Sequence, residues 1–194
     1  DHDYVCYVWF DALINYISAI GYGVDDAKFQ QWWPATCHLI GKDILTTHSV
    51  YWPIMLKAIG IATPQTIFAH GWWLVGDRKM GKSLGNVVNP MDMIGKYGVD
   101  AFRYFLAAEM SLGQDASFTE ESFINRYNSD LANGLGNTLS RAVRMAADAF
   151  DGKTPSERCD DNEVKRAAEA AVAAWDAAFR SCRLPEAAEA VRVL

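Results

Sequence analysis

Thr36-Cys37-His38-Leu39-Ile40-Gly41 is the stretch that decides the fold class of this chain. It is a short apolar run that ends at a glycine, which predicts a buried strand. Asp43 follows as a candidate helix cap, and a helix is expected from Ile44 towards Gly60, with a kink or a division at Pro53. A strand that leads directly into a helix is the repeating unit of an α/β domain.

Two further segments repeat this pattern on either side of it. Upstream, the continuous apolar run of residues 4–10 predicts a buried strand, and Asp11 is expected to cap a helix that continues to about Ile20. Downstream, residues 66–71 predict a third strand, and residues 72–75 can continue it as a hairpin. The chain is therefore expected to be α/β, the second half of a doubly wound, parallel, Rossmann-like sheet with its ligand at the carboxyl ends of the strands.

A loop with two lysines follows the third of these strands. Residues 77–86 read Asp-Arg-Lys-Met-Gly-Lys-Ser-Leu-Gly-Asn and place Lys79 and Lys82 three positions apart among small residues. Both ammonium groups can converge on one polyanion, although most clusters of surface lysines are only solvated. The expected position near the strand ends favours a loop that closes on phosphate groups.

The remainder of the chain is expected to be helical. Helices are predicted from Pro90 and from Asp100, and the spacing of Ser117 and Glu120 is that of a capping box at the start of a long helix. The expected division is residues 1–88 for the catalytic half-domain with the lysine loop, residues 89–116 for a connecting module, and residues 117–194 for a partial helical domain.

Composition restricts the possible classes of protein. The 194 residues are 51% hydrophobic, and 18 basic against 24 acidic residues give a net charge of -6, which argues against binding of RNA by bulk electrostatics. The four cysteines are widely spaced and are expected to be buried thiols in a reducing compartment, with no metal site. No apolar run is long enough for a membrane span, so a cytoplasmic protein is expected.

Four segments in order and spacing resemble the methionyl-tRNA synthetase family of class I aminoacyl-tRNA synthetases. They are Trp9-Phe10-Asp11-Ala12, residues 38–44 with His48, Phe68-Ala69-His70-Gly71, and the lysine loop. The loop is similar to the KMSKS signature of this class, with Gly81 in place of a serine. The resemblance runs from about Tyr4 to about Phe150, and it implies the C-terminal half of the catalytic domain followed by the start of an anticodon-binding domain.

The resemblance also implies roles for individual residues. The methionine pocket would be formed by Trp9, Ala12, Leu13, Tyr16, Ile44 and His48. ATP would be bound by Gly41, Asp43, His70, Gly71 and Lys82, with Lys79 and Lys82 as the catalytic residues. The anticodon would be read by Asn137 and Arg141. The alternatives are core packing for the pocket aromatics and His48, a helix cap for Asp43, and a solvated helix face for Asn137 and Arg141.

The implied reaction is an ATP-dependent ligation. The methionine carboxylate attacks the α-phosphate of ATP, which enters with Mg²⁺ as a substrate, and the adenylate then passes its acyl group to tRNA(Met). The HIGH signature and the first nucleotide-binding half have no counterpart here, so the chain is expected to be an incomplete fragment that is inactive without an N-terminal half, and zinc is expected only upstream. Two alternatives remain: another class I synthetase for an apolar amino acid, and a non-catalytic tRNA-binding fragment.

Overall fold

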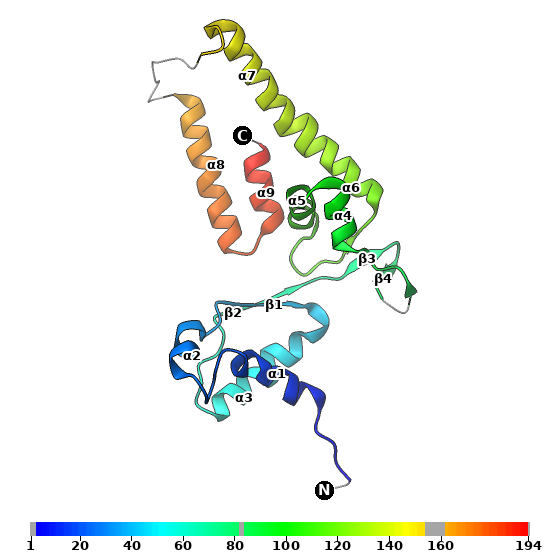
Figure 1. The fold of residues 1–194 in the computed structure, drawn as a ribbon, viewed down its shortest axis with the longest axis vertical. Coiled ribbons are helices and arrows are strands. Elements are labelled where there is room, and N and C mark those ends of the chain that lie inside the picture. Colours follow the sequence, from blue (N-terminus) through cyan, green and yellow to red (C-terminus); the bar gives the residue numbers. More distant parts are fainter. Residues whose placement is uncertain (1–2, 82–83, 154–161, 194) are drawn as a thin grey trace. The chain divides into compact units, whose positions relative to one another are not determined.

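The computed structural model describes residues 3–81, 84–153 and 162–193 (Figure 1). The chain forms two compact units, Asp1–His70 and Gly71–Leu194, and each is described by itself. Within the described residues, no helix is both long and apolar enough to cross a membrane.

The first unit contains one parallel strand pair and several helices. Its elements are α1 (Val8–Ser18), α2 (Asp26–Trp32), β1 (Cys37–Gly41), the 3₁₀ turn η1 (Lys42–Ile44), the π-helix η2 (Thr47–Tyr51), α3 (Trp52–Ala58) and β2 (Thr66–His70). β1 and β2 pair in parallel from Cys37 opposite Thr66 to Gly41 opposite His70. The predicted α/β class and the parallel pairing of these two strands are confirmed.

The helices bury one face of β1. His38 and Ile40 on this strand are buried, whereas Cys37 and Leu39 between them are exposed, because successive strand residues point to opposite faces. The core against which α1 and α3 pack consists of Leu13, Ile17, Phe29, Trp33, Trp52 and Leu56. This core fixes the position of α1 relative to the π-helix that precedes α3.

The predicted strand at residues 4–10 is wrong. Residues 4–7 form no helix or strand, and α1 begins at Val8, so that Asp11 lies in the first turn of the helix instead of capping it. Aromatic and β-branched residues favour strands only weakly, and tertiary packing overrides this preference. Here Leu13 and Ile17 are both buried in the core while Asn15 between them is exposed, and a strand would place all three on one face, so this pattern indicates a helix.

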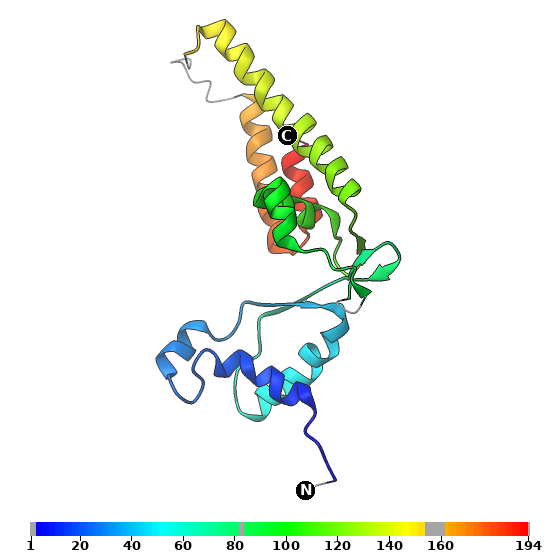
Figure 2. The same cartoon turned by 45° about the vertical axis from the view of Figure 1, so that its right-hand side comes forward.

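The second unit combines a small sheet with helices (Figure 2). The sheet has the order β4-β3-β5, with β3 (Trp73–Val75) antiparallel to β4 (Arg78–Lys79) and parallel to β5 (Ala116–Ser117). The helices are α4 (Pro90–Tyr97), α5 (Val99–Glu109), α6 (Glu120–Arg126), the π-helix η4 (Tyr127–Gly136), α7 (Asn137–Phe150), α8 (Glu163–Arg180) and α9 (Leu184–Arg192). Its core consists of Met93, Ala101, Phe102, Phe105, Phe118 and Phe123.

Two further predictions need correction, one in this unit and one that concerns cysteines of both units. The capping box at α6 is formed by Thr119 and Ser122, each side chain bonded to the backbone N–H of the other. Ser117 pairs with Leu74 in the sheet, so it is not the cap. The cysteines are also less buried than predicted, since Cys6 and Cys37 are exposed and Cys182 is half-buried, while Cys159 lies outside the described residues.

Candidate functional site

One face of α1 carries four of the six residues expected at the methionine pocket. Trp9, Ala12, Leu13 and Tyr16 follow one another at helical spacing. Leu13 is only 1% exposed and belongs to the core, whereas Ala12 is exposed, Trp9 is half-buried and Tyr16 is 36% exposed. The side chains of Trp9 and Tyr16 therefore reach the surface of the unit, whereas Leu13 is part of the core beneath α1.

The two aromatic residues of α1 meet His48 of η2. The Tyr16 hydroxyl lies 3.0 Å from His48 Nε2, and the ring centroids of Trp9 and His48 are 5.8 Å apart in an edge-to-face arrangement. His48 is 1% exposed, so its imidazole is removed from water. Three residues that are up to 39 positions apart in the sequence thus converge within one unit.

Hydrogen bonds determine which nitrogen of His48 carries the proton. His48 Nδ1 is 2.9 Å from the carbonyl oxygen of Ile44, and a carbonyl can only accept, so Nδ1 is protonated. In the neutral imidazole Nε2 is then an acceptor, and the Tyr16 hydroxyl donates to it. The Thr47 hydroxyl donates to the same Ile44 carbonyl at 2.6 Å and steadies this turn.

Three residues outside the expected methionine-binding set complete these surroundings. Thr47 lies beside His48, and His38 and Trp52 lie behind Tyr16, where Trp52 Nε1 donates a hydrogen bond to His38 Nε2 at 3.2 Å. The inward position of His38 on its strand, between exposed Cys37 and Leu39, is the signal that could have pointed to it. A polar residue at such a position requires a buried partner.

Three of the residues expected to bind ATP, Gly41, Asp43 and His70, lie near the carboxyl ends of β1 and β2. Gly41 pairs with His70 across the two strands, and Asp43 is exposed in η1 directly after Gly41. A Cβ at Gly41 would lie 2.6 Å from Asp43 Oδ1, so a side chain there would require the Asp43 carboxylate to move. The N-cap position of η1 is Gly41, and Asp43 lies within this turn.

Gly71 has a separate structural reason to be glycine. It belongs to the second unit, is buried, and a Cβ added to it would overlap the backbone carbonyl of Gln114. The neighbouring Trp72 N–H donates to Asp115 Oδ1 at 2.8 Å, so this strand start is bonded to the segment that leads into β5. The absence of a side chain at position 71 is therefore required by packing within the unit.

The lysine loop begins on the β3–β4 hairpin. Lys79 Nζ lies 4.3 Å from the centroid of the Trp72 ring, which is a cation–π distance. The Gly81 N–H donates to Asn86 Oδ1 at 2.9 Å, and Asn86 Nδ2 donates to the Lys79 carbonyl at 3.3 Å. Asn86, which the sequence analysis did not assign, thus bridges both sides of the loop, and Lys82 lies outside the described residues.

Asn137 and Arg141 lie in the first two turns of α7. Both are exposed, and their separation of four residues places them on one face of the helix. An amide and a guanidinium in this arrangement can hydrogen-bond the edges of unstacked bases.

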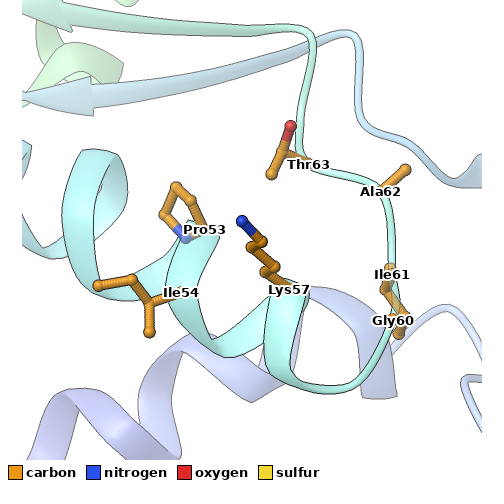
Figure 3. Close-up of a pocket in the computed structure, with 7 residues that line it drawn as sticks. All are labelled: Pro53, Ile54, Lys57, Gly60, Ile61, Ala62 and Thr63. Atoms are coloured by element: carbon orange, nitrogen blue, oxygen red, sulfur yellow. The ribbon is translucent and has the colours of Figure 1, made fainter.

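Two further features of the described residues bear on ligand binding. Within the described ranges, no group of three or more His, Cys, Asp or Glu residues is arranged to hold a metal ion. A hollow of about 460 Å³ lies between α3 and the loop that follows it, lined by Pro53, Ile54, Lys57, Gly60, Ile61, Ala62 and Thr63. Figure 3 shows the Lys57 side chain directed between Pro53 and Thr63, and none of the residues expected to bind methionine or ATP lines this hollow.

Comparison with known proteins identifies the family. Residues 1–143 match the family model described as tRNA synthetases class I (M). The methionine–tRNA ligase of Halalkalibacterium halodurans is 53% identical over 157 residues, which cover 80% of this chain and 24% of that protein. The methionine–tRNA ligase of Clostridium perfringens is 44% identical over 198 residues, which cover 100% of this chain and 31% of that protein. The chain thus spans between a quarter and a third of the length of these curated relatives.

Solved structures agree with the sequence matches. The methionyl-tRNA synthetase of Mycobacterium tuberculosis bound by methionyl-adenylate matches with a TM-score of 0.84 and 42% identity, covering 97% of this chain and 38% of that one. Its apo form matches with a TM-score of 0.80 and 38% identity, covering 97% of this chain and 37% of that one. The family model alone matches more than half of the residues, and the chain therefore belongs to the family of class I tRNA synthetases described as type (M).

Proposed function

We propose that this chain supplies the methionine pocket and the lysine loop of a methionine–tRNA ligase. The observation that carries the proposal is the convergence of Trp9 and Tyr16 on the buried His48 within the first unit. The relatives at 44% and 53% identity carry the name of this activity, and the matching solved structure holds methionyl-adenylate.

The proposed pocket suits a thioether better than a polar side chain. Methionine is flexible and polarisable, and it makes favourable contacts with aromatic rings. The hydrogen of the Tyr16 hydroxyl is directed to His48, so the tyrosine offers its ring and oxygen lone pairs to a ligand. Ile44 and Ala12 would complete an apolar lining, with Leu13 below it.

The proposed chemistry at ATP is a displacement at phosphorus. The methionine carboxylate attacks the α-phosphate of magnesium-bound ATP, and the α–β phosphoanhydride bond breaks to release pyrophosphate. Lys79 and Lys82 would neutralise the charge that grows on the leaving phosphates, and positioning and electrostatics are the main sources of rate in such a step. Gly41, Asp43, His70 and Gly71 would hold the nucleotide, with Asp43 at a ribose hydroxyl.

The second unit is proposed to contact tRNA(Met). Residues 89–116 would connect the catalytic half-domain 1–88 to the helical domain 117–194, and Asn137 and Arg141 would read the anticodon. Tight binding of tRNA(Met) that persists after the CAU anticodon is changed would contradict this assignment. The proposed ligation would take place in the cytoplasm, as expected from the sequence.

The decisive test measures methionine-dependent exchange of pyrophosphate into ATP. It uses a ligase of the relatives' full length that carries this sequence, and His48→Ala should raise the KM for methionine while leaving the KM for ATP within about twofold. Lys82→Ala should slow adenylate formation more than it weakens methionine binding. The matched control is Tyr22→Phe, which changes an exposed tyrosine of the first unit, and normal methionine affinity of a folded His48→Ala enzyme would return His48 to a packing role.

The same assay separates the alternatives. Exchange supported by isoleucine, valine or leucine instead of methionine would favour another class I synthetase for an apolar amino acid. Binding of tRNA without exchange by the full-length protein would favour a non-catalytic tRNA-binding protein. The 194 residues alone are expected to show no exchange, because they match only 24% to 31% of these ligases.

A further inference from the structure

His38 is a buried histidine to which the proposed methionine pocket gives no role. It is 6% exposed and lies on the inward face of β1. Its imidazole lies against the ring of Tyr16, with ring centroids 4.3 Å apart and an angle of 34° between the planes. This separation is that of a tilted stack, so the face of Tyr16 rests on His38.

The hydrogen bond from Trp52 determines the protonation state and the tautomer of His38. An indole Nε1–H is only a donor, and it lies 3.2 Å from His38 Nε2, so that nitrogen must present a lone pair. His38 is therefore a neutral imidazole with its hydrogen on Nδ1. Burial, and then the neighbouring His48, lower the pKa of His38, which agrees with the neutral form.

Two imidazoles therefore hold Tyr16 from two sides. His48 accepts the hydrogen of the hydroxyl at one end of the side chain, and His38 supports the face of the ring. Trp52, which is 1% exposed, holds His38 through the indole hydrogen bond. The ring centroids of Trp52 and Tyr16 are 6.1 Å apart. Rotation of the Tyr16 ring would break the hydroxyl contact or the stack, so the two contacts together determine its orientation.

We propose that His38 is a positioning residue for Tyr16, and that its ring, locked by Trp52, sets how well the pocket distinguishes a thioether from a hydrocarbon chain of the same length. The inference rests on the proposed function of Trp9, Tyr16 and His48. Contacts between sulfur and an aromatic ring depend on where the ring edge lies. Without the stack on His38, the Tyr16 ring would still exclude water from the pocket. Its orientation would vary, however, so the ring edge would no longer have a fixed position beside the sulfur.

The experiment compares methionine with norleucine, in which a methylene replaces the sulfur. In a full-length ligase that carries this sequence, the ratio of kcat/KM for methionine to kcat/KM for norleucine is measured for the unsubstituted enzyme, His38→Ala and His38→Phe. His38→Ala removes the ring and should lower this ratio by about tenfold, the order of effect of one misfitted group in an apolar pocket. His38→Phe restores a flat ring and should bring the ratio back to within about threefold of the unsubstituted enzyme.

Controls separate positioning from folding. Cys37→Ala changes the adjacent, exposed residue of the same strand and should leave the ratio unchanged. A merely structural role would lower the stability of His38→Ala without changing the ratio, and that result, or equal losses in His38→Ala and His38→Phe, would overturn the proposal. Absence of methionine activation by the unsubstituted enzyme would instead overturn the proposed function together with this inference.

A second measurement starts with the unsubstituted chain, so its first outcome needs no variant to fold. Long-range ¹H–¹⁵N spectra of the 194-residue chain at neutral pH should show His38 neutral, with the hydrogen on Nδ1 and an unprotonated Nε2 that accepts a hydrogen bond. In Trp52→Phe the Nε2 resonance should move towards that of a free imidazole nitrogen. A hydrogen on Nε2 of His38 in the unsubstituted chain would contradict the proposed hydrogen bond from Trp52 to this nitrogen.

Discussion

At the scale of single residues, the Tyr16 hydroxyl has one hydrogen to donate, and His48 accepts it. Replacing Tyr16 by phenylalanine leaves Nε2 of an imidazole that is 1% exposed without a donor. A buried polar atom left unpaired costs about 1–3 kcal/mol, so Tyr16→Phe should lower the free energy of unfolding by about that amount. Urea unfolding followed by tryptophan fluorescence measures it, with Tyr22→Phe as the control, and an unchanged midpoint would mean that water or another group satisfies Nε2.

His38 gives a prediction about acid stability. Burial and the neighbouring His48 lower its pKa in the folded chain, whereas an unfolded histidine titrates near about 6.5. Above that pH both states are neutral, and as the pH falls below it the unfolded chain binds the proton first. The free energy of unfolding should therefore decrease by up to about 1.4 kcal/mol per pH unit from this one group, until folded His38 also protonates.

The measurement compares urea unfolding of the unsubstituted chain and His38→Phe at about pH 7.5 and about pH 5.5, on either side of the unfolded value. The loss of stability between the two pH values should be smaller in His38→Phe, because that variant has no imidazole to protonate at this position. Equal losses in both proteins would show that folded His38 titrates like an unfolded histidine.

Individual residues also show how much of the candidate site could be predicted from the sequence. Trp9, Leu13 and Tyr16 were assigned from the family resemblance, and only Leu13 and Tyr16 lay on the helix that the spacing predicted, whereas Trp9 was expected in a strand and lies in α1. The contacts of His38 and Asn86 were not predictable, because their partners Trp52 and Gly81 are chosen by tertiary packing and loop closure, which no local pattern encodes. The sequence supplies candidates for contact, and the fold determines which of them meet.

At the scale of elements, patterns with one possible interpretation were predicted correctly. β1, β2, α4 and α5 each have flanking glycine or proline signals and a single periodicity. Residues 4–10 fit a buried strand by composition, but their last three residues form the start of α1. Short apolar runs are ambiguous between strand and helix, and burial of Leu13 and Ile17 resolves this one.

The π-helix η4 gives a prediction about two glycines. A Cβ at Gly136 would lie 2.9 Å from the carbonyl oxygen of Leu131, five residues earlier, whereas a Cβ at Gly95 in α4 would meet nothing within 4 Å. Gly95→Ala should therefore raise the free energy of unfolding by about 0.5–1 kcal/mol, as alanine usually does in a helix. Gly136→Ala should instead lower it by about 1–3 kcal/mol, the usual cost of a steric conflict.

Thermal or urea unfolding of both alanine variants checks this pair, because they are chemically identical substitutions in two helices of the same unit. Stabilisation of similar size in both would contradict the close contact at Gly136. It would indicate that η4 changes to a regular α-helix without cost when a side chain is added.

Contacts between α5, α6 and η4 predict a loss of stability in alkali. The Tyr104 hydroxyl donates to Asp130 Oδ2 at 3.0 Å, and Arg126 donates to the same oxygen at 3.1 Å. Burial, and then this hydrogen bond, raise the pKa of Tyr104 to about 12. Since an unfolded tyrosine ionises near about 10, the unfolded chain loses its proton first as the pH rises between these values, and stability decreases there.

Urea unfolding between about pH 9 and about pH 11.5 tests this, because the interval brackets the unfolded value. Tyr104→Phe should reduce the alkaline loss of stability, and Tyr127→Phe, which changes an exposed tyrosine of the same unit, should not. Identical pH profiles for Tyr104→Phe and the unsubstituted chain would show that the Asp130 contact does not protect the phenol.

At the scale of the whole molecule, acidic residues outnumber basic ones along the entire chain. Residues 1–116 carry 8 basic and 11 acidic side chains, and residues 117–194 carry 10 and 13, so neither part forms a basic arm. A protein with a net charge of -6 has little long-range attraction for a polyanion. If the chain binds tRNA, a few local contacts such as those proposed for Arg141 must provide the affinity.

The salt dependence of tRNA binding measures the number of those contacts. Each neutralised phosphate contributes about -0.7 to -0.9 to the slope of log K against log salt, so a chain with one to three local contacts should give a slope of about -1 to -3. Arg141→Gln should weaken binding and reduce the magnitude of the slope by about one, whereas Arg103→Gln, an exposed arginine on α5, should change neither. Fluorescence anisotropy with labelled tRNA(Met) gives both quantities. A slope steeper than about -5 would require many phosphate contacts, and it would contradict local recognition by an acidic chain.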